Sequence, residues 1–508
     1  MPATQTIVYD KWDGGEFGTM GPSQAPAGTW TGTNAVVYRS GYIGPRPGLH
    51  NLNLSIPSQG AGPLVGLGYF PTGSATDKKN WFIVGDRVMS FRTDSTGVTL
   101  CTTVLGAAND SDHFANGKES VRHIGTAALF TTNSGIYSFD PSLGTGAVVS
   151  EATDTPYGTD IELYRDRFVR TAAGTVYYSD PSDLSYWPPY AYIQVGYGWN
   201  CIAAFVLRDS LVLFMQDGTW TISGSLGSSG VLRKTSDTLP PGGKLAIVRS
   251  NDEIIYIPGS RSAPVLYNGS YGDELALKHL ESWASAGSTA YGIQSYGNRD
   301  VVFTSSQIGN YGLWRKNYIW TKHDFGSIEV GPMARNADDE IVIGTVTGAG
   351  VKPTFYVLDC DLDRPAFTSD ASADPGDDSD SVPIRAEVTL PDYLDPQGDD
   401  LIVRQVIVDF IKYNTGSSAN NELELTVTPI ARFGLPDDGT PLTGDGTNGL
   451  LFSEAGSAAT TTGTPDRLVF NGGLQGYAAG YRLKLEMQGV TVKKVTVKVE
   501  PRPSTPRY

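Results

Sequence analysis

Residues 211–222 read LVLFMQDGTWTI, and this stretch decides the fold. Its first half is a run of apolar side chains, Asp217 and Gly218 follow, and a shorter run then alternates threonine with larger apolar residues. An Asp-Gly pair between two such runs is typical of a β-hairpin, because both residues tolerate the positive φ that a tight turn requires. We therefore predict two antiparallel strands joined at Asp217-Gly218.

The same pattern recurs along the middle of the chain. Six further runs, each followed by a turn and a second run, begin at Phe82, Leu129, Phe168, Ile254, Val301 and Ile341. Successive starts lie roughly 39 to 47 residues apart, the period of a four-stranded propeller blade. One blade cannot bury both of its faces, whereas a closed ring of blades can. Residues 51–365 thus predict a β-propeller of about seven blades, and a set of β-sandwiches with accidental spacing is the alternative.

Composition agrees with β structure along the whole chain. The 508 residues include 60 Gly and 26 Tyr, and only 18% are charged, a balance typical of strands joined by tight turns. No apolar run approaches the roughly 18 to 20 residues of a membrane span. The first residues lack a basic segment followed by an apolar run, so no signal peptide is expected. Cys101, Cys201 and Cys360 lie far apart, which suits reduced, buried thiols in a protein made in the cytoplasm.

The repeat fades after Cys360. Five aspartates and several serines fall between residues 369 and 381, so we predict a solvated linker over 366–383. Alternating apolar runs then return, and residues 483–487 and 495–499 look like a hairpin with one buried face. We therefore expect residues 384–508 to form a separate antiparallel β-sandwich.

The first 50 residues follow neither pattern. They are rich in glycine and proline and carry Trp12 and Trp30. No partner for these tryptophans is evident in the repeats, and an isolated peptide of this composition would not be ordered. We expect residues 1–50 to be an extended arm and lead-in, with Trp12 and Trp30 buried against a neighbouring subunit.

The sequence contains no motif that indicates catalysis. Its five histidines occur singly without an HExxH spacing, and no GxSxG is present. Asp359, Asp361 and Asp363 have the alternating spacing of a calcium loop, but Arg364 and Asp370 stand where an EF-hand needs Gly and Glu. An ordinary loop is the better interpretation of this weak calcium-site candidate. We predict a protein that is not an enzyme and needs no cofactor.

The net charge of the chain limits which partners it can bind. At −16 the chain should repel nucleic acid rather than bind it, because affinity for phosphates comes from clustered Lys and Arg. An acidic passage would, however, let double-stranded DNA slide through without adhesion.

One block resembles a known protein family. It comprises YRDRF at 164–168, VYYSDP at 176–181, Trp187-Pro188, IQVG at 193–196 and the two runs of 209–225. We expect Trp187 and Trp220 to pack within their blades. The order of these elements resembles the propeller-bearing tail proteins of bacteriophages. It is most similar to the tail-nozzle, or packaged-DNA-stabilisation, proteins of short-tailed phages, and minor tail proteins of long-tailed phages share the block.

Two flanking segments extend the resemblance. Residues 40–49, SGYIGPRPGL, are similar to the turn that leads into that family's propeller, and residues 480–499 are similar to its terminal sheet domain. The resemblance implies a virion tail protein, in a homo-oligomeric ring that is sixfold in the nozzle proteins. Such a ring contacts other tail proteins, retains packaged DNA and passes it to the host without sequence-specific binding. The alternative is a tail-tip minor protein or a receptor-binding propeller that recognises a glycan or protein of the host surface.

Overall fold

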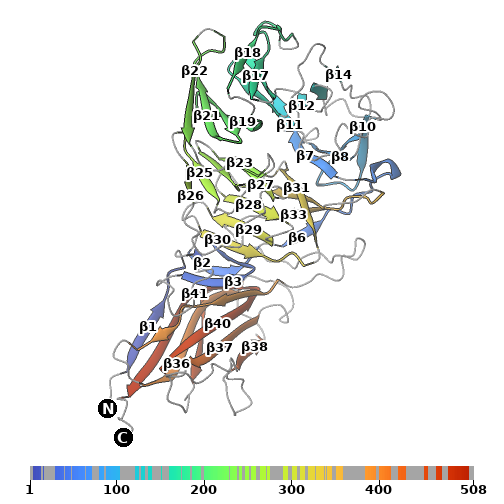
Figure 1. Cartoon of the computed structure of the whole chain (residues 1–508). Helices are drawn as coiled ribbons and strands as arrows, with labels where there is room; N and C mark the ends of the chain where they lie inside the picture. The colour runs from blue at the N-terminus through green and yellow to red at the C-terminus, as the bar shows by residue number, and fades with distance from the viewer. Residues whose placement is uncertain are drawn as a thin grey trace.

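A computed structural model describes most of residues 4–502 (Figure 1). The longer stretches outside it are residues 17–28, 71–78, 103–120, 140–149, 152–159, 275–289, 359–383, 413–421, 431–450, 456–464 and 472–478, and several short turns are also outside it. Apart from the 3-10 helix η2 (Ser58–Gly60), every described element is a β-strand, so the all-β prediction is confirmed. No described helix has the length and apolar content needed to cross a membrane.

Residues 49–358 form seven antiparallel sheets of four strands each. The first sheet contains β7 (Leu64–Phe70), β8 (Lys79–Val84), β9 (Arg87–Phe91) and β10 (Val98–Thr102). The second contains β11 (Val121–Ile124), β12 (Ala127–Thr131), β13 (Ile136–Phe139) and β14 (Ser150–Glu151). The third contains β15 (Asp160–Tyr164), β16 (Arg167–Ala172), β17 (Thr175–Tyr178) and β18 (Tyr192–Gln194). The fourth contains β19 (Cys201–Leu207), β20 (Ser210–Met215), β21 (Gly218–Ser223) and β22 (Val231–Ser236).

The remaining sheets of this region follow the same plan. The fifth contains β23 (Ile247–Ser250), β24 (Glu253–Tyr256), β25 (Val265–Tyr267) and β26 (Gly272–Glu274). The sixth contains β27 (Ala290–Ser295), β28 (Asp300–Ser305), β29 (Gly309–Trp314) and β30 (Ile319–His323). The seventh contains β31 (Val330–Arg335), β32 (Ile341–Thr345), β33 (Phe355–Leu358) and β6 (Leu49–Asn51). Each of the seven predicted hairpins is the second and third strand of one sheet, which confirms the hairpins.

Neighbouring sheets meet mainly through their first strands. Contacts join β7 to β11, β11 to β15, β15 to β19, β23 to β27, β27 to β31, and β31 back to β7. The fourth and fifth sheets share one core cluster, in which Phe214 packs edge-on against Tyr256 with the ring centroids 5.0 Å apart. The contacts therefore connect each sheet to the next and the seventh sheet to the first.

Strand β6 completes the seventh sheet from the other end of the region. It pairs antiparallel with β33, where Leu49 lies opposite Leu358. The Leu49 side chain is fully buried in one core with Tyr356 and Leu358. The earliest strand of the region is thus paired with its latest, so the first and last sheets cannot separate without breaking this ladder.

Two larger sheets lie at the other end of the molecule (Figure 1). One is ordered β39-β36-β41-β5-β4, with β1 also paired to β41, and the other β2-β3-β34-β40-β37-β38, with β35 paired to β40. Their N-terminal strands are β1 (Gln5–Tyr9), β2 (Gly15–Glu16), β3 (Thr29–Thr33), β4 (Ala35–Val37) and β5 (Ile43–Pro45). Their C-terminal strands are β34 (Ala386–Thr389), β35 (Tyr393–Leu394), β36 (Asp400–Lys412), β37 (Glu422–Ile430), β38 (Leu451–Ala455), β39 (Pro465–Asn471), β40 (Gly480–Gln488) and β41 (Val490–Arg502).

The predicted hairpin of residues 483–499 is not a hairpin. Strand β40 pairs in one large sheet and β41 in the other, and they are separated only by Gly489, whose φ is +62°. The alternation was interpreted correctly: Leu483 and Leu485 on β40, and Val495 and Val497 on β41, are fully buried. Because the chain changes sheet at Gly489, the two apolar faces meet in a common core instead of lying side by side.

The prediction of an extended arm over residues 1–50 is wrong where the structure describes them, because β1 to β5 are strands of the two larger sheets. Strand β1 pairs with β41 and β3 with β34, and Trp12 and Trp30 are 2% and 0% exposed in the core between the large sheets. Trp30 Nε1 donates to the carbonyl of Trp12 at 3.1 Å, and Trp12 Nε1 donates to the carbonyl of Lys493 at 3.2 Å. The prediction that these tryptophans contact a neighbouring subunit is wrong, because their own chain supplies both the apolar cover and the acceptors. The predicted linker, residues 366–383, lies outside the described residues.

Candidate functional site

The connection between β17 and β18, residues 179–191, is fastened to the third sheet at both ends. At its start, Phe168 N donates to Ser179 Oγ and Ser179 N donates to Phe168 O, both at 2.9 Å. Arg167 Nη1 donates to the Ser179 carbonyl at 2.9 Å. At its end, Tyr178 N donates to Ala191 O at 3.0 Å. The loop is therefore an extension of the sheet.

Asp180 shapes the first half of this loop. Its Oδ1 accepts from the Ser182 hydroxyl at 2.6 Å and from Ser182 N at 2.8 Å. These hydrogen bonds favour the carboxylate and lower the pKa of Asp180 below its usual value. Asp180 N donates to Tyr186 O at 2.9 Å, and Tyr186 N donates to Asp183 O at 3.0 Å. The Ser-Asp-Pro segment of the sequence thus forms an Asx-type turn, which places Tyr186.

Trp187 anchors the second half. It is 4% exposed and packs against Ile161, next to Phe168 and Tyr177, as expected from the sequence. Pro188 and Pro189 follow it, and their rings restrict the backbone φ. The Trp187 indole nitrogen is buried and has no hydrogen-bond partner among the described atoms. Apolar packing alone therefore holds this anchor.

Four aromatic side chains of this loop, of β18 and of the segment after β18 are exposed to solvent. Tyr190 is 80% exposed, Tyr192 51%, and Tyr186 and Trp199 49% each. Among the residues whose burial is described, these are the only large aromatic side chains that are exposed. Tyr192 lies on β18, the last strand of its sheet, and Figure 1 places β17 and β18 at the end of the molecule opposite β36 and β40. We call these four residues the aromatic surface.

The surroundings of the aromatic surface are mostly polar, and the Arg167 guanidinium at the start of the loop is bonded to the Ser179 carbonyl. The sequence has no Lys or Arg from residue 171 to residue 207, whereas Asp180 and Asp183 fall in the loop. Ser182, Gln194 and Asn200 are exposed. The aliphatic side chains of Ala191 and Val195 are buried in the core shared by the third and fourth sheets. The arrangement offers ring faces and hydrogen-bonding groups but few exposed aliphatic groups.

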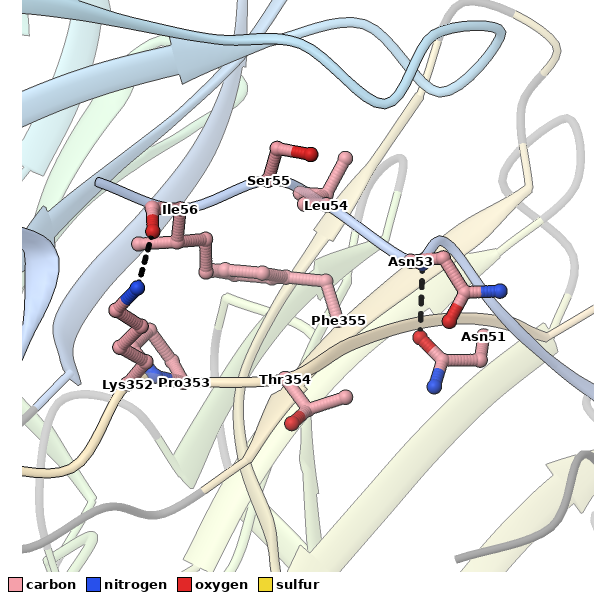
Figure 2. A pocket seen from close by; sticks show the side chains of 9 residues that line it. All are labelled: Asn51, Asn53, Leu54, Ser55, Ile56, Lys352, Pro353, Thr354 and Phe355. Atoms are coloured by element: carbon pink, nitrogen blue, oxygen red, sulfur yellow. Dashed lines mark hydrogen bonds between the residues drawn. The ribbon is translucent and has the colours of Figure 1, made fainter. Parts of the chain in front are cut away.

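A second candidate is a depression of about 600 Å³ beside β6 (Figure 2). It lies between residues 51–56 and 352–355, the segments that meet where β6 joins the seventh sheet. Lys352 Nζ donates to Ile56 O at 2.6 Å, and Asn53 N donates to Asn51 Oδ1 at 2.9 Å (Figure 2). The first hydrogen bond joins the two segments, and the second shapes the turn at residues 51–53. Both groups therefore stabilise the seventh sheet.

Of the residues predicted from the sequence, the structure describes Trp12 and Trp30, which lie at neither place. Asp359, Asp361 and Asp363, the weak calcium-loop candidate, lie outside the described residues. Within the described part of the chain, no group of three or more His, Cys, Asp or Glu side chains is placed to hold a metal ion. Cys201 is buried, and burial raises the pKa of its thiol to about 12. The buried Trp12 and Trp30 belong to the core at the far end of the molecule.

The aromatic surface was missed in the sequence. Its residues lie within or next to the block that resembles phage tail proteins, but only the tryptophan packing was considered there. A Tyr-x-Tyr alternation at 190–192 fits a half-buried strand and does not say which ring faces water. Two features of the sequence indicate an exposed aromatic site. Pro188-Pro189 lies directly before Tyr190, and no Lys or Arg occurs from residue 171 to residue 207.

Comparisons with known proteins leave the family open. No family model matches the chain, and no curated protein matches it. Similar solved structures include two extracellular domains from B. thetaiotaomicron, one described as part of a hybrid two-component system and one as part of a one-component system. Each is 12% identical, with TM-scores of 0.40 and 0.39. The match covers 61% of this chain but only 39% of either neighbour, and such values support no conclusion on fold or function.

Proposed function

We propose that the seven four-stranded sheets are the blades of a seven-bladed β-propeller and that the two larger sheets form a β-sandwich. Three observations support the propeller: the sheets follow one another in chain order, the first strands are in contact in six of the seven neighbouring pairs, and β6 completes the last sheet. A closed ring leaves only short strand edges, which is the usual reason for this architecture. The common core of the larger sheets supports the sandwich.

We also propose that the protein is a structural component of a bacteriophage tail. In this role it is one subunit of a nozzle or hub ring that closes the tail, retains packaged DNA and passes it at infection. The support from sequence is the resemblance of residues 164–225 and of the turn 40–49. The support from structure is the position of Arg46, which stands in that turn.

Arg46 joins the two regions of the molecule. It is fully buried, its Nε donates to Asn34 Oδ1 at 2.9 Å and its Nη2 donates to Asp324 O at 2.6 Å. Its guanidinium carbon lies 4.5 Å from the centre of the Phe325 ring. Asn34 lies between β3 and β4 of the larger sheets, whereas Asp324 and Phe325 follow β30 of the sixth sheet.

This junction is the observation that carries the proposed role. A buried arginine with several partners stabilises the contact between the two regions, and a ring subunit that must keep its shape in the tail would need such a contact. The net charge of −16 also suits a channel from which polyanionic DNA must be released. The role is that of a scaffold, and we assign it no catalytic residue.

Electron microscopy of phage particles that encode the chain tests this role. An antibody against the purified protein should label the tail, and the labelled structure should be a closed ring, sixfold if it is a nozzle. Particles assembled without the chain should lose their packaged DNA. Absence of the chain from purified virions would overturn the proposal.

A further inference from the structure

We propose that the aromatic surface binds a neutral, hydroxyl-rich polysaccharide. The inference goes beyond the scaffold role and does not need the ring, since all four residues belong to one sheet and its connections. It assigns a binding function to Tyr186, Tyr190, Tyr192 and Trp199, none of which is needed for the core.

The exposure of these rings is the first observation. A tyrosine or tryptophan buries roughly 150–250 Å² when it is covered, and several exposed apolar side chains together often mark an interaction site. Tyr190 nevertheless leaves 80% of its surface in water. Each ring combines an apolar face with a polar hydroxyl or N–H. A sugar ring is its complement, because it presents C–H groups on its faces and hydroxyl groups around its rim.

Charge selects among the polymers that could stack on these rings. Asp180 and Asp183 give the loop two negative charges, whereas no Lys or Arg occurs from residue 171 to residue 207 and the nearby Arg167 is bonded to the Ser179 carbonyl. Phosphate- or carboxylate-rich polymers, including nucleic acids, need cations for binding and would be repelled. A neutral chain avoids this repulsion. The exposed Ser182, Gln194 and Asn200 and the Asp183 carboxylate can exchange hydrogen bonds with its hydroxyls.

The type of exposed side chain disfavours a protein partner. The centres of protein interfaces combine aromatic residues with Met, Arg and aliphatic groups and are depleted in charge. Here the aliphatic Ala191 and Val195 are buried, and the exposed residues around the rings are proline or polar. The surface therefore suits a partner that is itself rich in hydroxyl groups.

The loop that carries Tyr186 and Tyr190 is also anchored before any partner arrives. Trp187 packs the loop onto Ile161, and hydrogen bonds of Asp180 and Ser179 fix its first half. Binding then costs little conformational entropy beyond the rotamers of the exposed rings. This makes stacking on a flexible polysaccharide favourable even though each contact is small.

Affinity electrophoresis of the full chain tests the proposal. Native gels would contain mannan, glycogen, dextran, laminarin or a galactan as neutral probes, and alginate or heparin as anionic ones. We expect at least one neutral polymer to retard the protein and the anionic polymers to leave its mobility unchanged. Tyr190→Ala and Tyr192→Ala should each weaken the retardation about tenfold, and the double variant should abolish it.

A matched control is Val231→Ser, because Val231 is 49% exposed on β22 of the next sheet and carries no ring. This variant should bind like the original chain, and an unchanged melting temperature shows that the tyrosine variants are folded. Retardation by no neutral polymer, by anionic polymers alone, or equally in all variants would overturn the proposal. So would loss of self-association in Tyr190→Ala, which would make the surface a subunit contact. Tails containing Tyr190→Ala should still assemble, so failure here leaves the scaffold role standing.

Discussion

The two regions of this molecule close their cores in different ways. In the seven four-stranded sheets, nearly every strand pairs with the strand before or after it in the chain, and only β6 comes from afar. In the two larger sheets, strands from both ends of the chain are interleaved, so that β1 pairs with β41 and β3 with β34. The four-stranded sheets pair strands that are close in the sequence. The two larger sheets cannot form completely until the last residues of the chain are present.

This difference predicts unequal sensitivity to changes at the N-terminus. Removing the first strands should damage the larger sheets and spare the smaller ones, although these strands lie closer in sequence to the smaller ones. The Arg46 junction, by contrast, belongs to both regions and should couple them.

Deleting residues 1–33 should have the largest effect. It removes β1, β2 and β3 with Trp12 and Trp30, and loss of a fully buried tryptophan costs about 3–5 kcal/mol by itself. We expect calorimetry to lose the transition of the larger sheets and to keep that of residues 49–358. Deleting residues 503–508 is the control and should leave both transitions. A truncated chain with both transitions intact would refute this asymmetry.

Arg46→Ala should come next. It removes two hydrogen bonds of a buried cation and its contact with the Phe325 ring, so we expect a loss of about 3 kcal/mol in unfolding free energy. The two calorimetric transitions should then lie further apart in temperature, because the contact that couples the two regions is lost. Arg404→Ala is the matched control, because that exposed arginine pairs with Glu500 and should cost less than about 1 kcal/mol. Equal losses of unfolding free energy in the two variants would show that Arg46 does not stabilise the junction.

Acid should act on the same junction through His323. Burial, with a smaller contribution from the nearby Arg46 charge, lowers the pKa of His323 from 6.5 to about 3. Between these values the unfolded chain binds a proton that the folded chain does not. Stability should therefore be complete above pH 6.5 and fall by about 1.4 kcal/mol per unit as pH drops toward 3. Urea titrations should show a shallower fall in His323→Gln, and identical slopes would contradict this assignment.

Two tryptophans provide the finest comparison. Trp30 Nε1 donates to a carbonyl, whereas the buried Trp187 Nε1 has no partner among the described atoms. Trp30→Phe should therefore cost about 1 kcal/mol more than Trp187→Phe, because it alone strands a buried acceptor. Urea midpoints of the two variants measure the difference. A larger cost at Trp187 would mean that its indole nitrogen has an acceptor.

Local features of the fold could be predicted from the sequence. The hairpin at Asp217-Gly218 and its six counterparts depend on turn chemistry and alternation within about a dozen residues, and all are present. The packing of Trp187 and the buried alternation of β40 and β41 are equally local.

Distant pairings could not be predicted. Nothing in residues 5–9 shows that their partner is 495–499, and Gly489 reads equally as a hairpin turn or as a crossing between sheets. The burial of Trp12 and Trp30 within their own chain could not be predicted, because the residues that cover them lie at the far end of the chain. Exposure of Tyr190 also depends on the loop that Trp187 anchors, which alternation alone cannot specify.

The most direct test is a cross-link between the first and last strands. Thr6 on β1 lies opposite Lys498 on β41, so cysteines introduced by Thr6→Cys and Lys498→Cys should form a disulfide. In dilute solution the oxidised double variant should remain a single chain of altered mobility on a non-reducing gel, and Thr6→Cys with Val231→Cys should not cross-link. Disulfide-linked dimers alone would show that the first strand pairs with another subunit and would contradict the account.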